Sequence, residues 1–137
     1  MKILVLTGAD DCCGPMAAHF MNDFNRSVEA CSAGVCPAEK VKSQVIELMH
    51  ECFCDLSDYK PTQFELSMLE EADLIVIIGE ICLDVPSDKC MRLEMPPQLI
   101  KVETETKEEF RTLCDYVKNE SFVMLKSAIG RYSKPSS

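Results

Sequence analysis

The feature that most constrains the fold is a short apolar run, residues 2–7, that stops abruptly at a polar turn. Such a run is typical of a strand that is buried on both faces of a sheet. Residues 8–14 have the composition of a loop, and Pro15 stands where the first residue of a helix is expected. Apolar residues then recur at helical spacing as far as Phe24. The start of the chain therefore predicts a strand, a loop and a helix.

The rest of the chain continues this alternation. Further strands are expected at residues 27–32, 73–78 and 99–103, and further helices at 38–51, 61–69 and 107–129. Residues 80–97 have the composition of a long loop. Strands that alternate with helices pair in parallel through right-handed crossovers. We therefore predict an α/β fold with three layers, in which helices cover both faces of a four-stranded parallel sheet.

Length and charge limit the organisation and the partners of the chain. Residues 1–130 are expected to form one domain, and residues 131–137 a loose C-terminal tail. The formal net charge is −9, which argues against nucleic acid and anionic membranes because both attract cationic surfaces. No segment has the length of a membrane span, and the opening residues do not resemble a signal peptide. We expect a cytoplasmic protein.

The chain has nine cysteines, an odd number. Without an export signal, this favours free thiols over a disulfide framework. The spacings lack the paired C-x2-C of structural zinc sites, so we expect no metal and no cofactor. Most of these thiols are expected to fill core volume. Cys12 and Cys13 differ because they precede a probable helix, whose field lowers a thiol pKa, whereas Asp10 and Asp11 act in the opposite direction.

Several segments resemble the low-molecular-weight tyrosine phosphatases and the thioredoxin-linked arsenate reductases. Residues 3–17, ILVLTGADDCCGPMA, are similar to that family's first strand and phosphate-binding loop, C-x-G-N-x-C-R-S-x-M-A. Residues 31–34 (CSAG), 55–57 (DLS) and 72–76 (ADLIV) are similar, in the same order, to its S-A-G, D-I-S and A-D-L-V stretches. The resemblance implies the strand order 2-1-3-4. Ligands of such a sheet lie beyond the carboxyl ends of its strands, here at the loop.

The chain departs from the family pattern at the positions that carry the chemistry. Thr7 aligns with the nucleophilic cysteine, Asp10 with the asparagine, Cys12 with the second loop cysteine and Cys13 with the phosphate-binding arginine. The family's general acid is an aspartate followed by proline, and this chain has no Asp-Pro dipeptide. The degenerate loop comprises Thr7, Gly8, Ala9, Asp10, Asp11, Cys12 and Cys13.

These departures remove what a phosphatase needs. A threonine hydroxyl lacks the acidity of a loop cysteine, and a thiol cannot grip an oxyanion as a guanidinium does. Asp10 and Asp11 add negative charge that repels phosphate. We assign no catalytic residue and predict no phosphomonoester hydrolysis. The resemblance then favours a binding or regulatory domain that takes an unknown protein partner or small ligand.

The alternative function is a thiol-disulfide oxidoreductase of arsenate reductase type. In the related reductases, a disulfide passes from the loop to two cysteines after the third strand, and Cys82 and Cys90 lie in the corresponding segment here. A relay would begin at Cys12 or Cys13 and would use a thioredoxin-like reductant. A thiol site for a soft metal or arsenite, and the absence of any thiol function, also remain open. Tyr59, just before Pro61, is expected in an exposed turn.

Overall fold

The computed structural model describes residues 1–79, 81, 87–93 and 107–132. The elements in chain order are β1 (Lys2–Thr7), α1 (Cys13–Phe24), β2 (Glu29–Gly34), α2 (Ser43–Glu51), α3 (Leu66–Glu71), β3 (Leu74–Ile78), a 3-10 turn (Ser87–Lys89), β4 (Cys90–Leu93) and α4 (Lys107–Tyr132). The four strands form one sheet in the order β2-β1-β3-β4, and all three pairings are parallel. The predicted α/β fold and strand order are confirmed.

The fourth strand lies where the sequence was interpreted as a long loop. β4 pairs with β3 in a register that runs from Ile75 opposite Cys90 to Ile78 opposite Leu93. Only Leu93 of this strand is buried. A four-residue edge strand with one buried side chain has no continuous apolar run, which is why the pattern missed it. The strand expected at residues 99–103 lies outside the described residues.

Helix boundaries differ from the sequence prediction at the N-termini of α1 and α2 and at the C-terminus of α4. α1 begins at Cys13, two residues before Pro15, and proline is tolerated in the first turn because no helical hydrogen bond needs its N–H. α2 begins at Ser43 rather than at residue 38, because the Ala38 N–H instead donates to the Ala9 carbonyl. α4 continues to Tyr132, two residues into the expected tail, and residues 133–137 lie outside the described part.

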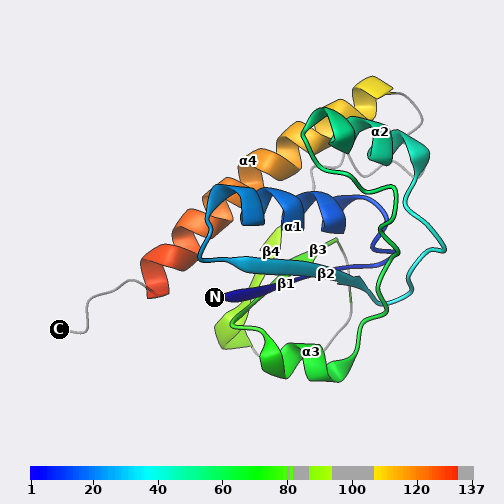
Figure 1. Ribbon diagram of the computed structural model, residues 1–137. Coiled ribbons are helices and arrows are strands. Elements are labelled where there is room, and N and C mark those ends of the chain that lie inside the picture. The colour runs from blue at the N-terminus through cyan, green and yellow to red at the C-terminus, as the bar shows by residue number, and fades with distance from the viewer. Residues whose placement is uncertain (80, 82–86, 94–106, 133–137) are drawn as a thin grey trace.

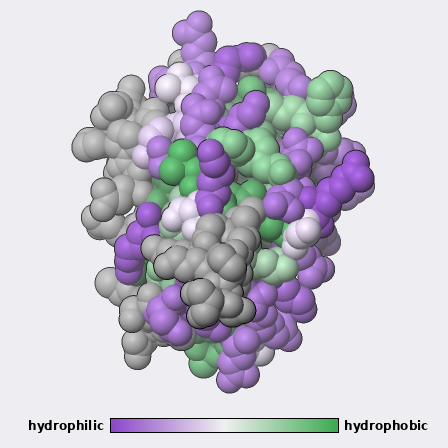
Figure 2. Space-filling model, turned by 90° about the vertical axis from the view of Figure 1, so that its left-hand side faces the viewer, coloured by the Kyte–Doolittle hydropathy of each residue, from purple (hydrophilic) through white to green (hydrophobic). Residues whose placement is uncertain are grey.

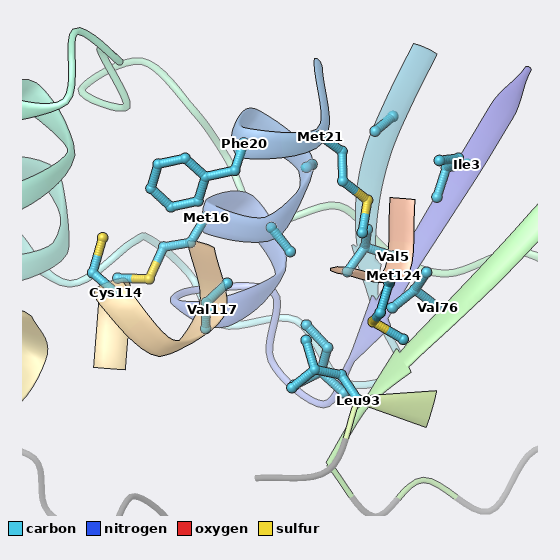
Figure 3. Close-up of a cluster of buried hydrophobic side chains, with 14 of the residues drawn as sticks. Ile3, Val5, Met16, Phe20, Met21, Val76, Leu93, Cys114, Val117 and Met124 are labelled. Carbon is cyan, nitrogen blue, oxygen red and sulfur yellow. The ribbon is translucent and has the colours of Figure 1, made fainter. Parts of the chain in front are cut away.

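The sheet separates two hydrophobic clusters. α1 packs against β1, β2 and α4, and α2 packs against α4, whereas α3 lies on the other side of the sheet (Figure 1). Alternate residues of each central strand enter opposite clusters, as the period of two requires. Ile3, Val5 and Val76 face the larger cluster, which includes Met16 and Phe20 of α1 (Figure 3). β3 is therefore apolar throughout, and β1 is apolar between Lys2 and Thr7.

The face at the amino end of β1 has an ordinary mixed surface. On the side of the molecule that Figure 2 shows, hydrophilic side chains surround smaller hydrophobic patches. None of the helices in the described part of the chain combines the length and the hydropathy needed to cross a bilayer.

Candidate functional site

The loop between β1 and α1 is fixed by the segment that follows β2. Val35 N–H donates to the Thr7 carbonyl (3.1 Å), Cys36 N–H to the Gly8 carbonyl (2.8 Å) and Ala38 N–H to the Ala9 carbonyl (2.9 Å). Three successive loop carbonyls are therefore bound by neighbouring backbone. The loop lies beyond the carboxyl end of the sheet, where ligands of parallel sheets bind.

Asp10 turns into the protein instead of facing the solvent. Its backbone has a φ of 53°, and the residue is 0% exposed. Its Oδ2 accepts hydrogen bonds from the Tyr59 hydroxyl (2.5 Å) and the Thr62 N–H (2.8 Å). Its own N–H donates to Thr7 Oγ1 (2.9 Å). Asp10 therefore ties the loop to residues 59–62.

Two glycines make room for the buried carboxylate. A Cβ at Gly34 would lie 3.0 Å from the backbone and Cβ of Asp10, and a Cβ at Gly14 would lie 3.0 Å from Asp10 Oδ1. That oxygen is buried and has no hydrogen-bond partner in the described part of the chain. The loop is thus shaped around Asp10, with one carboxylate oxygen fully engaged and the other beside Gly14.

The expectation that Tyr59 lies in an exposed turn is wrong. Its hydroxyl is within 2.8 Å of Ser32 Oγ on β2, in addition to its bond to Asp10. Burial, followed by the hydrogen bond to Asp10, raises the pKa of Tyr59 to about 12. Nothing local in the sequence links Tyr59 to Asp10, because the two are 49 positions apart. Only the folded chain reveals this pair.

Thr7 is the last residue of β1 and is 7% exposed. Its hydroxyl oxygen accepts the Asp10 N–H, so it occupies one amide of the loop. Thr7 thus acts as a fixed acceptor inside the loop in this structure.

Cys12 and Cys13 interact at the start of α1. Cys13 is the first residue of the helix, and Cys12 is its N-cap. A hydrogen bond from the Cys12 thiol lowers the pKa of Cys13, although burial and Asp11 act in the opposite direction. The same hydrogen bond, together with burial, raises the pKa of Cys12 well above its usual range. The positive charge of Lys42, the N-cap residue of α2, also lowers the pKa of Cys13, and the local sequence did not reveal this cation.

The structure does not bring Cys90 to the loop. Cys90 lies in the row of Leu4 and Ile75, near the amino end of the sheet, and packs against the cluster on the α3 side. Cys12 and Cys13 pack against the other cluster, so the sheet separates them from Cys90. Cys82 lies outside the described residues. In the described ranges, no group of three or more His, Cys, Asp or Glu side chains could hold a metal ion.

Comparison with known proteins identifies the class to which this fold and loop belong. The family model of the low molecular weight phosphotyrosine protein phosphatases matches residues 2–125. The chain therefore belongs to this family.

Its relatives include both phosphatases and arsenate reductases. A putative arsenate reductase of Halobacterium salinarum is 32% identical over 66 residues, which cover 48% of this chain and 46% of that protein. The alignment thus spans about half the length of the curated relative. A crystal structure of arsenate reductase from Archaeoglobus fulgidus has a TM-score of 0.71 at 24% identity and covers 91% of this chain and 99% of that chain.

The tyrosine phosphatase Wzb from Escherichia coli K30, in complex with sulphate, has a TM-score of 0.77 at 17% identity. That match covers 93% of this chain and 97% of Wzb. At such identities, the two structures show that the fold is shared.

Proposed function

We propose that this protein is a binding or regulatory domain that has lost the phosphatase activity of its family. The proposal rests on one observation: β1 ends in Thr7, whose hydroxyl is hydrogen-bonded inside the loop, where the family pattern has a nucleophilic cysteine. A threonine hydroxyl is a weak nucleophile unless a base activates it. The retained loop would hold a protein partner or a small ligand without forming a covalent intermediate.

The charges around the loop support the same conclusion. Cys13 stands where the family pattern has an arginine, and a thiol offers no bidentate fork for an oxyanion. Asp10 is buried in the loop and Asp11 is partly exposed beside it. Lys42 brings one positive charge toward the thiol pair, but a single ammonium does not replace a guanidinium that clamps the transferred group.

The test is hydrolysis of p-nitrophenyl phosphate. We expect the unmodified protein to match background, and the double variant Thr7→Cys, Cys13→Arg to gain at least about tenfold, because a loop thiolate and an anion clamp are restored. This substrate has a good leaving group, so the missing general acid limits the rate less. Thr7→Ala is the matched control. Turnover by the unmodified protein that disappears in Thr7→Ala would refute the proposal.

A second candidate is a thiol-disulfide oxidoreductase, and the lowered pKa of Cys13 favours it. After mild peroxide oxidation, this function would form a disulfide that joins Cys12 or Cys13 to Cys82 or Cys90. Two thiols are oxidised to one disulfide, and hydrogen peroxide is reduced to water. Because Cys90 lies across the sheet, a link to it requires rearrangement of the described structure. Mass mapping of the oxidised protein distinguishes a specific link from random oxidation, with Cys36→Ser, which removes an exposed thiol, as the control.

The thiol pair also yields a test that does not depend on a relay. We expect the alkylation rate of Cys13 to reach half its maximum below pH 9, because the Cys12 thiol stabilises its thiolate. Cys12→Ala removes that donor and should move the midpoint upward, whereas Cys12→Ser keeps a donor and should move it less. Mass spectrometry of the Cys13 peptide across a pH series measures both. An unchanged midpoint in Cys12→Ala would show that the hydrogen bond has no influence.

The reductant, the cellular location and the domain boundaries stay predictions. A thioredoxin-like reductant would be needed only if the protein is an oxidoreductase. The cytoplasmic location and the single domain over residues 1–130 are likewise part of the proposal.

A further inference from the structure

β2 lies at one edge of the sheet, and the backbone groups that point away from β1 can be identified from its hydrogen bonds. Glu29 N–H donates to the Met1 carbonyl (2.9 Å) and Val35 N–H to the Thr7 carbonyl (3.1 Å), so odd-numbered residues face β1. Because backbone directions alternate along a strand, Ala30, Ser32 and Gly34 direct their N–H and C=O groups away from the sheet.

Two of these three residues are covered by the protein itself. The Asn22 side-chain amide donates to the Ala30 carbonyl (2.9 Å), and its oxygen accepts the Ala30 N–H (2.7 Å). Gly34 N–H donates to the Thr62 carbonyl (2.8 Å), and Phe64 N–H donates to the Gly34 carbonyl (2.9 Å). The outward backbone groups on both sides of Ser32 are therefore already hydrogen-bonded within the protein.

Ser32 lies between these two covered positions. Its backbone N–H and C=O form no hydrogen bond with any residue in the described ranges, although Ser32 is only 8% exposed. Nearly all buried backbone groups in proteins are paired. Two pockets, of about 340 and 290 Å³, lie on either side of this edge, and Cys31, Ser32 and Thr62 line both of them. A polar backbone pair thus borders a space that admits a small molecule.

We infer that this edge binds a small molecule that carries a primary carboxamide. The Ser32 N–H would donate to the carbonyl of the ligand, and the amide of the ligand would donate to the Ser32 carbonyl. Asn22 already makes this double hydrogen bond with Ala30, two residues earlier on the same edge. The apolar body of the ligand would pack on Ala18 and Leu56, which line the larger pocket. The ligand would contact Ser32 and not the loop itself, although Tyr59 and Thr62, which line the larger pocket, are hydrogen-bonded to Asp10 of the loop.

Other ligands fit this edge less well. An extended peptide would need several outward residues in succession, but the positions on both sides of Ser32 are occupied. A carboxylate has no N–H for the Ser32 carbonyl. In the smaller pocket it would also meet Glu29 and Glu71, which outnumber Lys2. The carboxamide is the group that satisfies both backbone atoms without bringing a charge.

Titration of the ¹⁵N-labelled protein with benzamide tests the inference. The amide signal of Ser32 should shift in a saturable way, whereas that of Ala30, which is already paired, should move much less. N,N-dimethylbenzamide keeps the acceptor but lacks the donor, so it should bind about threefold to tenfold more weakly. Benzoate should not bind at comparable concentration. A Ser32 signal that stays in place, or equal binding by the dimethyl compound, would overturn the inference.

The protein offers a second readout in two exposed thiols. Cys31 borders both pockets, whereas Cys36 lines neither. Saturating benzamide should slow the modification of Cys31 by methyl methanethiosulfonate, which carries no amide, and should leave Cys36 unaffected. Equal rates at Cys31 with and without benzamide would contradict the proposed position. Protection of Cys13 instead would place the ligand at the loop and also overturn it.

Discussion

In the part of the chain that the structure describes, two residues other than glycine have a left-handed backbone, and they differ in what holds them there. Asp10 has a φ of 53° and Phe53 a φ of 62°. Asp10 is 0% exposed and is hydrogen-bonded to three other residues. Phe53 is 98% exposed and follows the C-terminus of α2. A buried network imposes one conformation, and a helix end imposes the other.

The turn after α2 explains the conformation of Phe53. Cys54 N–H donates to the Met49 carbonyl (2.9 Å) and Phe53 N–H to the His50 carbonyl (3.1 Å), which is the Schellman pattern of a helix C-terminus. Glycine is usual at the position of Phe53, because a Cβ is unfavourable at positive φ. Aspartate tolerates this region better than a bulky residue does. The positive φ of Asp10 is therefore part of the hydrogen-bonded network of the site. The positive φ of Phe53 can be relieved by substitution without changing that network.

The largest expected effect is that of Asp10→Ala. The change removes the carboxylate that accepts from the Thr62 N–H and from the Tyr59 hydroxyl, which keeps only Ser32 Oγ as a partner. Losing a hydrogen-bond partner away from solvent costs about 1–3 kcal/mol. We expect the free energy of unfolding to fall by roughly 3 kcal/mol, measured by urea denaturation.

Asp10→Asn is the matched control, since its amide oxygen can accept both hydrogen bonds and it tolerates positive φ. We expect it to retain most of the stability. If both variants lose equally little, the network around Asp10 does not hold the loop, and the contrast with Phe53 fails.

Tyr59→Phe tests the partner in the same network and should have a smaller effect. It removes the hydrogen bond to the Asp10 carboxylate, which contributes about 1.5 kcal/mol, and the hydrogen bond shared with Ser32 Oγ. The pKa of Tyr59 is raised to about 12 from its usual 10, so the folded state favours the neutral phenol. This contribution is complete below pH 10 and is lost as the pH rises toward 12.

The measurement compares the unfolding free energies of the protein and of Tyr59→Phe between pH 8 and pH 12. The difference should shrink toward the alkaline end. The chain has only three tyrosines, so absorbance at 295 nm should also lose a component that titrates near pH 12 in the variant. A constant difference across this range would show that the phenol does not titrate as the geometry requires.

The sequence predicted the scaffold better than the details of the site, for a physical reason. β1 and β3 are buried on both faces, so their apolar runs are continuous and easily recognised. β4 has one buried residue and gave no such signal. The inward turn of Asp10 depends on Tyr59, Thr62 and space beside Gly34, which are distant in sequence. A local pattern shows a carboxylate in a loop, but the direction of its side chain depends on tertiary contacts.

The smallest expected effect is a gain of stability in Phe53→Gly. Because Phe53 is 98% exposed, removing its ring loses almost no buried area, while glycine relieves the cost of positive φ at the end of α2. We expect a gain of about 0.5–1 kcal/mol in the free energy of unfolding, equivalent to a few degrees in Tm. Phe53→Ala is the control: it removes the ring but keeps the Cβ, so it should not produce this gain. If alanine stabilises the protein as much as glycine does, the exposed ring, and not the positive φ, lowers the stability at Phe53. The comparison of backbone strain between Asp10 and Phe53 would then fail.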